Sequence, residues 1–375
     1  MVALLMAACS NDGSMDQTAV ANADVQNLQV YPVVNGLTRG TVWTNNNFES
    51  FHLSTSGDGF LKAIDGTETA NIDGTVSKSS GIWRFDDGIT YYWPSKNATA
   101  NFLAYAPVSF KPSANYTADA DDLSKLMDIV VAYNTGTAFD FSTGVPLTFR
   151  HATSQIVVKA DNASTSDVTI EVKAIRLKNI CSSAYFTMPT TPTTDNLLDN
   201  PWTLNSTSTD YMADLSSVRT LSGTAADVTG DNPLLLIPQQ LGSADIAQST
   251  GQYLSVLIKV TAADGTPIFP VAQTDASGKA ITNTGYAWVA TDINTLWEPG
   301  KRYIYTLHFQ KDSYGKIDSD QDDGGTDDPA DPTPDNDSDD DDIPGPGDDV
   351  VDTPVELTIN VTVSDWTEQT ENTTL

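Results

Sequence analysis

Cysteine is almost absent from this chain of 375 residues, which contains only Cys9 and Cys181. Two cysteines cannot build a disulfide framework, so the fold must be stabilised by an apolar core. Cys181 follows Ile180, and none of the three histidines is close to it in the sequence. We therefore expect Cys181 to be a small buried hydrophobic residue rather than a nucleophile, which would need a neighbouring base.

Basic residues are also scarce, with 19 Lys and Arg against 50 Asp and Glu and a net charge of −31. Binding to nucleic acid needs a Lys- and Arg-rich surface that neutralises phosphates, so this class of partner is excluded. An anionic lipid surface would repel the chain for the same reason. The acidic residues are concentrated in residues 312–352, which contain 17 Asp and one Lys.

No stretch of the sequence reaches the ~20 apolar residues that a membrane-spanning helix needs. The N-terminus has a short apolar run, VALLMAA at residues 2–8, directly before Cys9. Ala7 and Ala8 suit a lipoprotein signal peptidase, which admits small side chains. Met6 departs from this pattern because Leu is usual there, and no Lys or Arg precedes the run. We predict that Cys9 is lipidated and is the only membrane attachment.

Catalytic and metal-binding motifs are missing as well. His52, His151 and His308 lie in strand-like segments and lack the spacing to one another, or to Cys or Glu, that metal ligands show. We expect each of them to be a surface or strand-edge histidine rather than a metal ligand or a catalytic base. The sequence contains no G-x-S-x-G motif, P-loop or dinucleotide-binding motif. We predict that the protein is not an enzyme and that it has no catalytic residue, no metal site and no cofactor.

The Asp-rich segment and the aromatic clusters each allow an alternative function. Asp318, Asp320 and Asp322 have the 1-3-5 spacing of a calcium-binding loop, but Asp323 stands where Gly is required and Pro329 where Glu is required. A solvated spacer therefore explains them better. The aromatic residues could line a glycan platform, but they more often fill sandwich cores. These residues are Trp83, Phe85, Tyr91, Tyr92, Trp93, Tyr303 and Tyr305.

From residue 41 to about 310 the chain reads as one short strand after another. The segments are rich in β-branched and aromatic residues and are separated by Gly, Asn, Asp, Ser, Thr and Pro clusters. Helical periodicity is nearly limited to residues 119–130. This pattern predicts an all-β fold of two β-sandwich domains, with a boundary in the Thr- and Pro-rich run 187–201.

The last part of the chain combines a linker with a single strand. The Asp-rich residues 312–352 have little to bury, which predicts a disordered, self-repelling linker. Behind it, five apolar residues alternate with polar ones, which predicts a strand with one apolar face. They are Val355, Leu357, Ile359, Val361 and Val363. We expect this face to be buried, either in the C-terminal domain of the same chain or in another subunit.

Several segments, taken in order, resemble the fimbrillin-like lipoproteins of Bacteroidales, which are subunits or accessory proteins of type V pili. The resemblance runs from Cys9 to Trp366. The segments that carry it are the signal before Cys9, Thr38-Arg39, YYWP at 91–94, FLAYAP at 102–107, LTFRHA at 147–152, QIVVK at 155–159, LLLIPQ at 234–239, WEPGKRYIY at 297–305 and the terminal strand before Trp366.

The resemblance implies two transthyretin-like β-sandwich domains and an assembly route. The precursor is exported as a lipoprotein, and a trypsin-like protease cuts after an arginine, here Arg39, so that the mature chain starts at Gly40. The N-terminal strand is lost, and the exposed groove takes a strand from the next subunit. The acidic linker before the terminal strand is longer than in this pattern, which leaves open whether the strand is donated.

These expectations give the following division of the chain. The signal covers residues 1–9, the tether and removable strand 10–39, the N-terminal sandwich 40–187, the C-terminal sandwich 188–311, the linker 312–352 and the terminal strand 353–375. We expect a structural or adhesive subunit of a fimbria at the outer membrane, whose partners are other subunits, the outer membrane through the lipid on Cys9 and a ligand on a host or bacterial surface. The alternative is a glycan-binding outer-membrane lipoprotein of a polysaccharide-uptake system.

Overall fold

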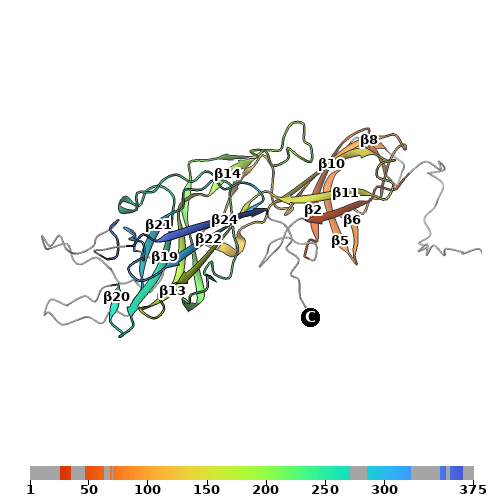
Figure 1. The fold of residues 1–375 in the computed structure, drawn as a ribbon. Coiled ribbons are helices and arrows are strands. Elements are labelled where there is room, and N and C mark those ends of the chain that lie inside the picture. The colour runs from red at the N-terminus through yellow and green to blue at the C-terminus, as the bar shows by residue number, and fades with distance from the viewer. Residues whose placement is uncertain are drawn as a thin grey trace, which may run out of the picture. The chain divides into compact units, whose positions relative to one another are not determined.

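A computed structural model of the chain describes residues 26–34, 47–62, 68–69, 71–270, 285–321, 347–351 and 355–365. The described residues form strands and loops, and their only helical turns are two short 3-10 segments, η1 (Leu123–Lys125) and η2 (Ile246–Gln248). The predicted all-β sandwich class is therefore confirmed. Figure 1 shows the strands along the chain.

The chain divides into two compact units. Unit 1 comprises Met1–Tyr31, Leu53–Leu103 and Asn134–Pro146. Unit 2 comprises Pro32–His52, Ala104–Tyr133 and Leu147–Leu375.

A seven-stranded sheet contains strands that contribute residues to both units. Its order is β1 (Val30–Val34), β11 (Val145–His151), β10 (Val130–Thr137), β8 (Thr99–Ala106), β2 (Ser50–Gly57), β5 (Asp73–Ser79) and β6 (Ile82–Phe85). A small sheet in unit 1 has the order β4 (Glu68–Thr69), β3 (Phe60–Lys62) and β7 (Tyr91–Tyr92). β1 is an edge strand, which is where a strand containing Pro32 can be tolerated.

Aromatic side chains fill the core of unit 1. The rings of Phe60, Trp93, Phe102 and Phe141 contact one another with centroids 5.2–6.3 Å apart.

Four aromatic residues of the clusters singled out in the sequence are core residues in the two units. Tyr91, Trp93, Tyr303 and Tyr305 are all at least 94% buried. These four aromatics are therefore core residues, as the preferred interpretation of the sequence expected, and they do not line a glycan platform.

Unit 2 contains two larger sheets. One has the order β17 (Ala226–Asp227), β12 (Ser154–Asn162), β22 (Lys301–Phe309) and β24 (Thr358–Asp365), with β18 (Leu234–Leu236) also paired to β12. The other has the order β16 (Ser208–Thr220), β13 (Val168–Cys181), β19 (Tyr253–Ala262), β21 (Ala287–Asp292) and β23 (Lys316–Ile317), with β20 (Pro267–Phe269) paired to β19. A third sheet has the order β15 (Trp202–Leu204), β14 (Ser183–Phe186) and β9 (Asn115–Thr117).

The strand pairing does not follow the boundary that we expected between residues 187 and 188. β12 runs parallel to β22 over eight residue pairs, and β13 is antiparallel to β19. In both pairs one strand precedes residue 187 in the sequence and the other follows it. A break in the local sequence pattern at 187–201 could not reveal this, because strand pairing is decided by contacts between residues far apart in the sequence.

Part of the expected disordered linker, residues 312–352, is folded. Tyr314, Ile317 and Asp318 are each at least 97% buried, and Val350 is 6% exposed. Residues 312–321 and 347–351 therefore belong to the folded part of the chain.

Candidate functional site: the terminal strand and its attachments

The terminal strand β24 is paired to its own chain. It runs antiparallel to β22 in an uninterrupted register of eight pairs, from Lys301 opposite Asp365 to His308 opposite Thr358. β24 is the last strand of its sheet, so its other edge carries no strand among the described residues (Figure 1). β24 is therefore attached mainly by one ladder of backbone hydrogen bonds to β22.

The side chains of β24 are poorly buried. Ile359, Val361 and Val363 lie opposite Leu307, Tyr305 and Tyr303 and therefore share the core face of the sheet with them. The three β22 side chains are 0–1% exposed, whereas Val361 is 39% and Val363 is 48% exposed. Among the described residues, the core that covers these side chains of β22 leaves Val361 and Val363 of β24 partly exposed.

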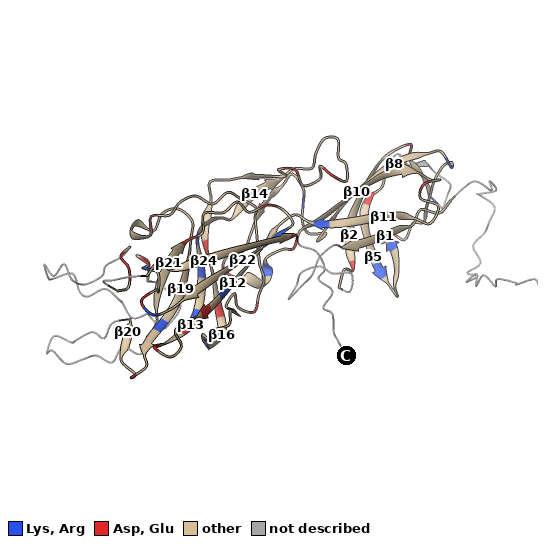
Figure 2. Ribbon diagram, in the orientation of Figure 1, with Lys and Arg blue, Asp and Glu red and all other residues tan. Residues whose placement is uncertain are grey.

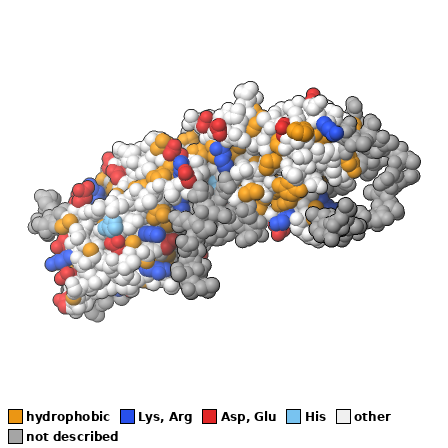
Figure 3. Space-filling view, turned by 45° about the vertical axis from the view of Figure 1, so that its right-hand side comes forward, with side chains coloured by type: hydrophobic (Ala, Val, Ile, Leu, Met, Phe, Trp, Pro, Cys, Tyr) orange, Lys and Arg blue, Asp and Glu red, His pale blue; other side chains and the backbone are white. Residues whose placement is uncertain are grey.

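The expectation that all five apolar side chains of the terminal strand are buried is therefore wrong for this chain alone. Val355 is 46% exposed, and Leu357 and Ile359 are half-buried. The alternation of apolar and polar residues correctly predicted which side chains share one face of the strand. A sequence pattern does not show whether another layer of the protein covers that face. Figure 3 shows hydrophobic side chains at several separate places on the visible surface.

Two side-chain contacts join β24 to its neighbour β22. Lys301 on β22 forms an ion pair with Asp365, and this hydrogen bond raises the pKa of Lys301 above its ordinary value. His308 on β22 contacts Asp161 of β12 through Nδ1 at 2.9 Å and Asn360 of β24 through Nε2 at 2.9 Å. Both contacts are partly exposed, so they add little to the free energy that retains the strand.

The residues that lead into β24 are clasped by the segment after β22. Val355 N–H donates to Asp312 O at 2.7 Å, and Ser313 Oγ donates to Glu356 O at 3.1 Å. Further back, Ile317 N–H donates to Asp348 O at 2.8 Å. We call these contacts of Asp312, Ser313 and Ile317 with Asp348, Val355 and Glu356 the clasp.

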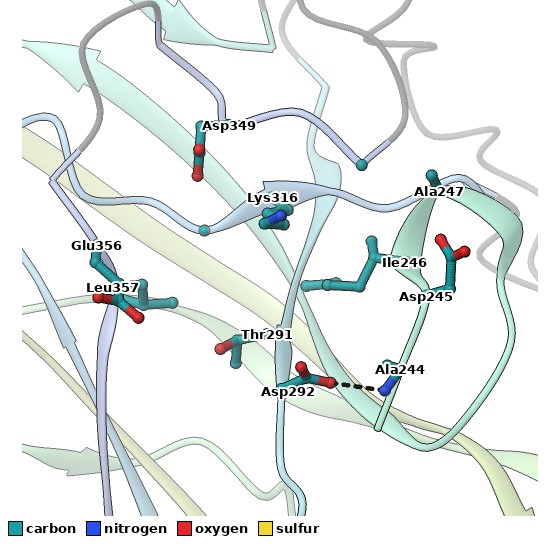
Figure 4. Close-up of a pocket in the computed structure, with 13 residues that line it drawn as sticks. Ala244, Asp245, Ile246, Ala247, Thr291, Asp292, Lys316, Asp349, Glu356 and Leu357 are labelled. Atoms are coloured by element: carbon teal, nitrogen blue, oxygen red, sulfur yellow. Dashed lines mark hydrogen bonds between the residues drawn. The ribbon is translucent and has the colours of Figure 1, made fainter. Parts of the chain in front are cut away.

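A cavity of about 500 Å3 lies beside the clasp. Its lining includes Lys316, Asp349, Glu356 and Leu357 together with the loop around η2 and the end of β21 (Figure 4). The lining thus includes residues on both sides of the clasp. Within the described part of the chain, no group of three or more His, Cys, Asp or Glu side chains could hold a metal ion.

A largely buried ion cluster fixes the chain within the acidic residues 312–352. Arg176 on β13 is 4% exposed, donates to Asp318 Oδ2 at 3.0 Å and stacks over Trp288. Lys178 donates to Asp320 Oδ2 at 2.6 Å and also to Asp210 on β16. Figure 2 shows both signs of charge on β13 and β16. We call Arg176, Lys178, Asp210, Asp318 and Asp320 the anchor.

The anchor replaces the solvated spacer that we expected at this point. Asp318 is completely buried and also accepts from Tyr253 and Ser255. Its oxygens are therefore engaged by protein donors. Neither Arg176 nor Lys178 could be recognised from the sequence, because alternating basic residues in a strand usually lie on a solvated face.

The N-terminal segment is held more firmly than β24. Leu28, Val30 and Val34 are 5%, 4% and 1% exposed, and Val145 N–H at the start of β11 donates to Gln29 O at 2.8 Å. Tyr31 packs on Gly144, where a Cβ atom would come within 2.2 Å of its ring. The predicted lipidation residue Cys9 and the predicted cleavage residues Arg39 and Gly40 lie outside the described residues.

The remaining candidate residues do not form a second site. Cys181 is half-buried, and its Sγ lies 3.3 Å from Asn205 O. His52 stacks on Tyr105. We expected surface or strand-edge histidines; His151 is not at the surface, because it is the last residue of β11, is 1% exposed and contacts Asp128 at 2.7 Å. No helix in the described part of the chain is long and apolar enough to span a membrane.

The fold and these contacts define an all-β protein whose most distinctive feature is a loosely attached edge strand. Comparison with known proteins gives the family. The sequence model of the fimbrillin-like family matches residues 37–322, so the chain belongs to the fimbrillin-like family. It is accordingly a structural protein of the fimbrial and adhesion type, not an enzyme.

Solved structures are similar to the chain at low sequence identity. A fimbrial protein from Bacteroides vulgatus ATCC 8482 is 16% identical with a TM-score of 0.54, and the match covers 91% of this chain and 100% of that chain. The fimbrial anchor protein Mfa2 from Porphyromonas gingivalis is 10% identical with a TM-score of 0.28, with 75% and 90% covered. The first likeness supports the fold. No curated protein matches the sequence.

Proposed function

We propose that this fimbrial subunit assembles by strand exchange after proteolysis, with β24 as the strand that is donated. Cleavage after Arg39 releases the segment that contains β1 and opens a groove along β11. The terminal strand of another copy then enters this groove. The contact is head-to-tail and does not close on itself, so it generates a filament.

The unequal burial of the two strands is the observation that carries this proposal. When β24 separates from β22, little additional apolar surface becomes exposed to water, because Val361 and Val363 are already 39% and 48% exposed. The place of β1 buries Val30 and Val34 almost completely. Full burial of one Val or Leu side chain stabilises by about 1.5–3 kcal/mol, so several such side chains favour transfer.

Backbone hydrogen bonding also favours β24 over β1 as the strand in this groove. β1 contains Pro32, which has no N–H, whereas Thr358–Asp365 contains no proline. A groove left open after removal of β1 would expose unpaired backbone and apolar side chains, which is an aggregation hazard until another strand fills it.

Limited trypsin treatment of the purified chain, followed by electron microscopy, tests this function. Filaments are expected from the wild-type chain, with new N-termini at Gly40, and not from Arg39→Ala. Trypsin-treated chains that start at Gly40 and stay monomeric would refute strand exchange. A mature surface form that starts at Cys9 would instead remove the proteolytic trigger.

Lipid attachment at Cys9 belongs to the same proposal and places the precursor at the outer membrane. In a bacterial host the full chain should partition into detergent and carry acyl chains. The variant Cys9→Ser should lose both properties. Unchanged mass and membrane fraction in Cys9→Ser would refute lipidation.

A further inference from the structure

The segment ahead of β1 pairs with a different strand from β1 itself. Leu28 N–H donates to Tyr91 O at 2.8 Å, Trp93 N–H donates to Gln26 O at 2.9 Å, and Asn27 lies opposite Tyr92 in an antiparallel bridge. One residue later, Gln29 O accepts from Val145 N–H of β11. Residues 26–34 therefore occupy two edges, first that of β7 and then that of β11.

The terminal strand repeats the residue pattern of this segment. Leu28, Val30, Pro32 and Val34 alternate with Gln29, Tyr31 and Val33. In the same spacing, Leu357, Ile359, Val361 and Val363 alternate with Thr358, Asn360 and Thr362. When the two leucines are aligned, residues 355–363 fall on residues 26–34 and Glu356 falls on Asn27.

Other registers fit less well. A slip by one residue would turn every apolar side chain to the wrong face. A slip by two residues toward the C-terminus would put Asp365 in the place of Val34, which is 1% exposed. A slip by two in the other direction would put Val355 in the place of Leu28 and leave an unfilled gap.

We propose that residues 355–363 of one copy replace residues 26–34 of the next in this single register, with Val355–Leu357 pairing along β7. This inference rests on the proposed strand exchange and adds the partner edge and the register. It assigns a role to the residues before β24: Leu357 N–H donates to Tyr91 O and Val355 O accepts from Trp93 N–H.

The clasp has a consequence for this docking. In the unprocessed chain Val355 N–H is bonded to Asp312 O, and Ser313 Oγ is bonded to Glu356 O. The segment that would pair with β7 is thus engaged within its own chain. Opening of the clasp must precede pairing with β7.

A cross-strand disulfide tests the register. In an antiparallel pair such as Asn27 and Tyr92, whose hydrogen bonds are made by the flanking residues, the Cα atoms are about 4.5 Å apart. This distance lies within the range of about 4.4–6.8 Å that a disulfide spans. The test chain carries Glu356→Cys and Tyr92→Cys together with Cys9→Ser and Cys181→Ser, so that no other thiol is present before or after cleavage at Arg39. Two matched controls replace Glu356→Cys by Thr358→Cys or Pro354→Cys.

After trypsin treatment and mild oxidation, Glu356→Cys with Tyr92→Cys should give a ladder of covalent oligomers on a non-reducing gel. The two controls and the uncleaved chain should stay monomeric on the gel. Filaments of the test chain without a ladder, or a ladder only with Thr358→Cys or Pro354→Cys, would overturn the register and leave strand exchange standing. If the Cys181→Ser chain without further changes forms no filaments after cleavage at Arg39, both proposals fall.

Discussion

Tyr305 and Val361 lie directly opposite each other on β22 and β24, on the same face of the sheet, yet Tyr305 is completely buried and Val361 is 39% exposed. Burial also raises the pKa of Tyr305, whose hydroxyl accepts from Trp297 Nε1–H at 2.8 Å. The buried core on this face of the sheet therefore ends between these two residues. β24 extends the sheet without completing the core, which is the arrangement expected of a strand that can leave.

Truncation of Val361 should cost little in the uncleaved chain. We expect Val361→Ala to lower the free energy of unfolding by less than about 1 kcal/mol, because much of the side chain is already in water. The matched variant Val34→Ala, at a position 1% exposed, should cost at least about 1.5 kcal/mol. Urea denaturation measures both values. Equal losses would show that β24 is packed as firmly as β1.

The Lys301–Asp365 ion pair should influence only the end of β24. Removal of one partner of an exposed pair costs about 0.2–1 kcal/mol, so Lys301→Ala should speed amide exchange at the Asp365 end by no more than about fivefold. The pKa of Lys301 is raised in the folded state, so its contribution is complete below the ordinary lysine pKa and is lost as pH rises through the raised value. The control is Lys78→Ala, because Lys78 contacts Trp83 on β6 and not β24. Faster exchange throughout β24 would mean that the ion pair holds the whole strand.

The anchor should be much more sensitive than the strand that it precedes. Asp318→Asn removes the charge of the one completely buried carboxylate in the anchor and leaves Arg176 with one partner fewer, which should cost about 3–5 kcal/mol. Asp199→Asn, at an exposed loop position, should stay within about 0.5 kcal/mol of the wild type. The two midpoints in urea give the comparison. A small loss in Asp318→Asn would show that the cluster does not fix this segment.

Alkaline unfolding should follow from buried tyrosines. Burial raises the pKa of Tyr91, Tyr116 and Tyr286 to about 12 from an ordinary value of about 10. A pKa raised in the folded state contributes stability that is present below pH ~10 and is lost as pH rises toward ~12. Tyrosinate absorbance and circular dichroism, followed together, should show part of the tyrosines ionising only as the fold is lost. Complete ionisation near pH 10 with the fold intact would contradict this expectation.

The sequence predicted local features well and long-range ones poorly. The alternation from Val355 to Val363 predicted a strand and its apolar face, because side chains alternate strictly along any strand. It could not predict β22 as the partner or the exposure of Val361, since both depend on layers formed by distant residues. Arg176 and Lys178 of the anchor alternate along β13, and basic residues in such a pattern usually lie on a solvated face of a strand. Residues 318–321 cover them, and no local signal links segments about 140 positions apart.

Protection of Val363 in the filament is the most direct test of the account. In a chain carrying Val363→Cys together with Cys9→Ser and Cys181→Ser, the thiol should react readily with a water-soluble maleimide before cleavage at Arg39, because this position is 48% exposed. After cleavage and assembly, we expect the same thiol to react at least tenfold more slowly, since it then takes the place of Val34, which is 1% exposed. A thiol that reacts equally fast in the monomer and in the filament would contradict donation of β24.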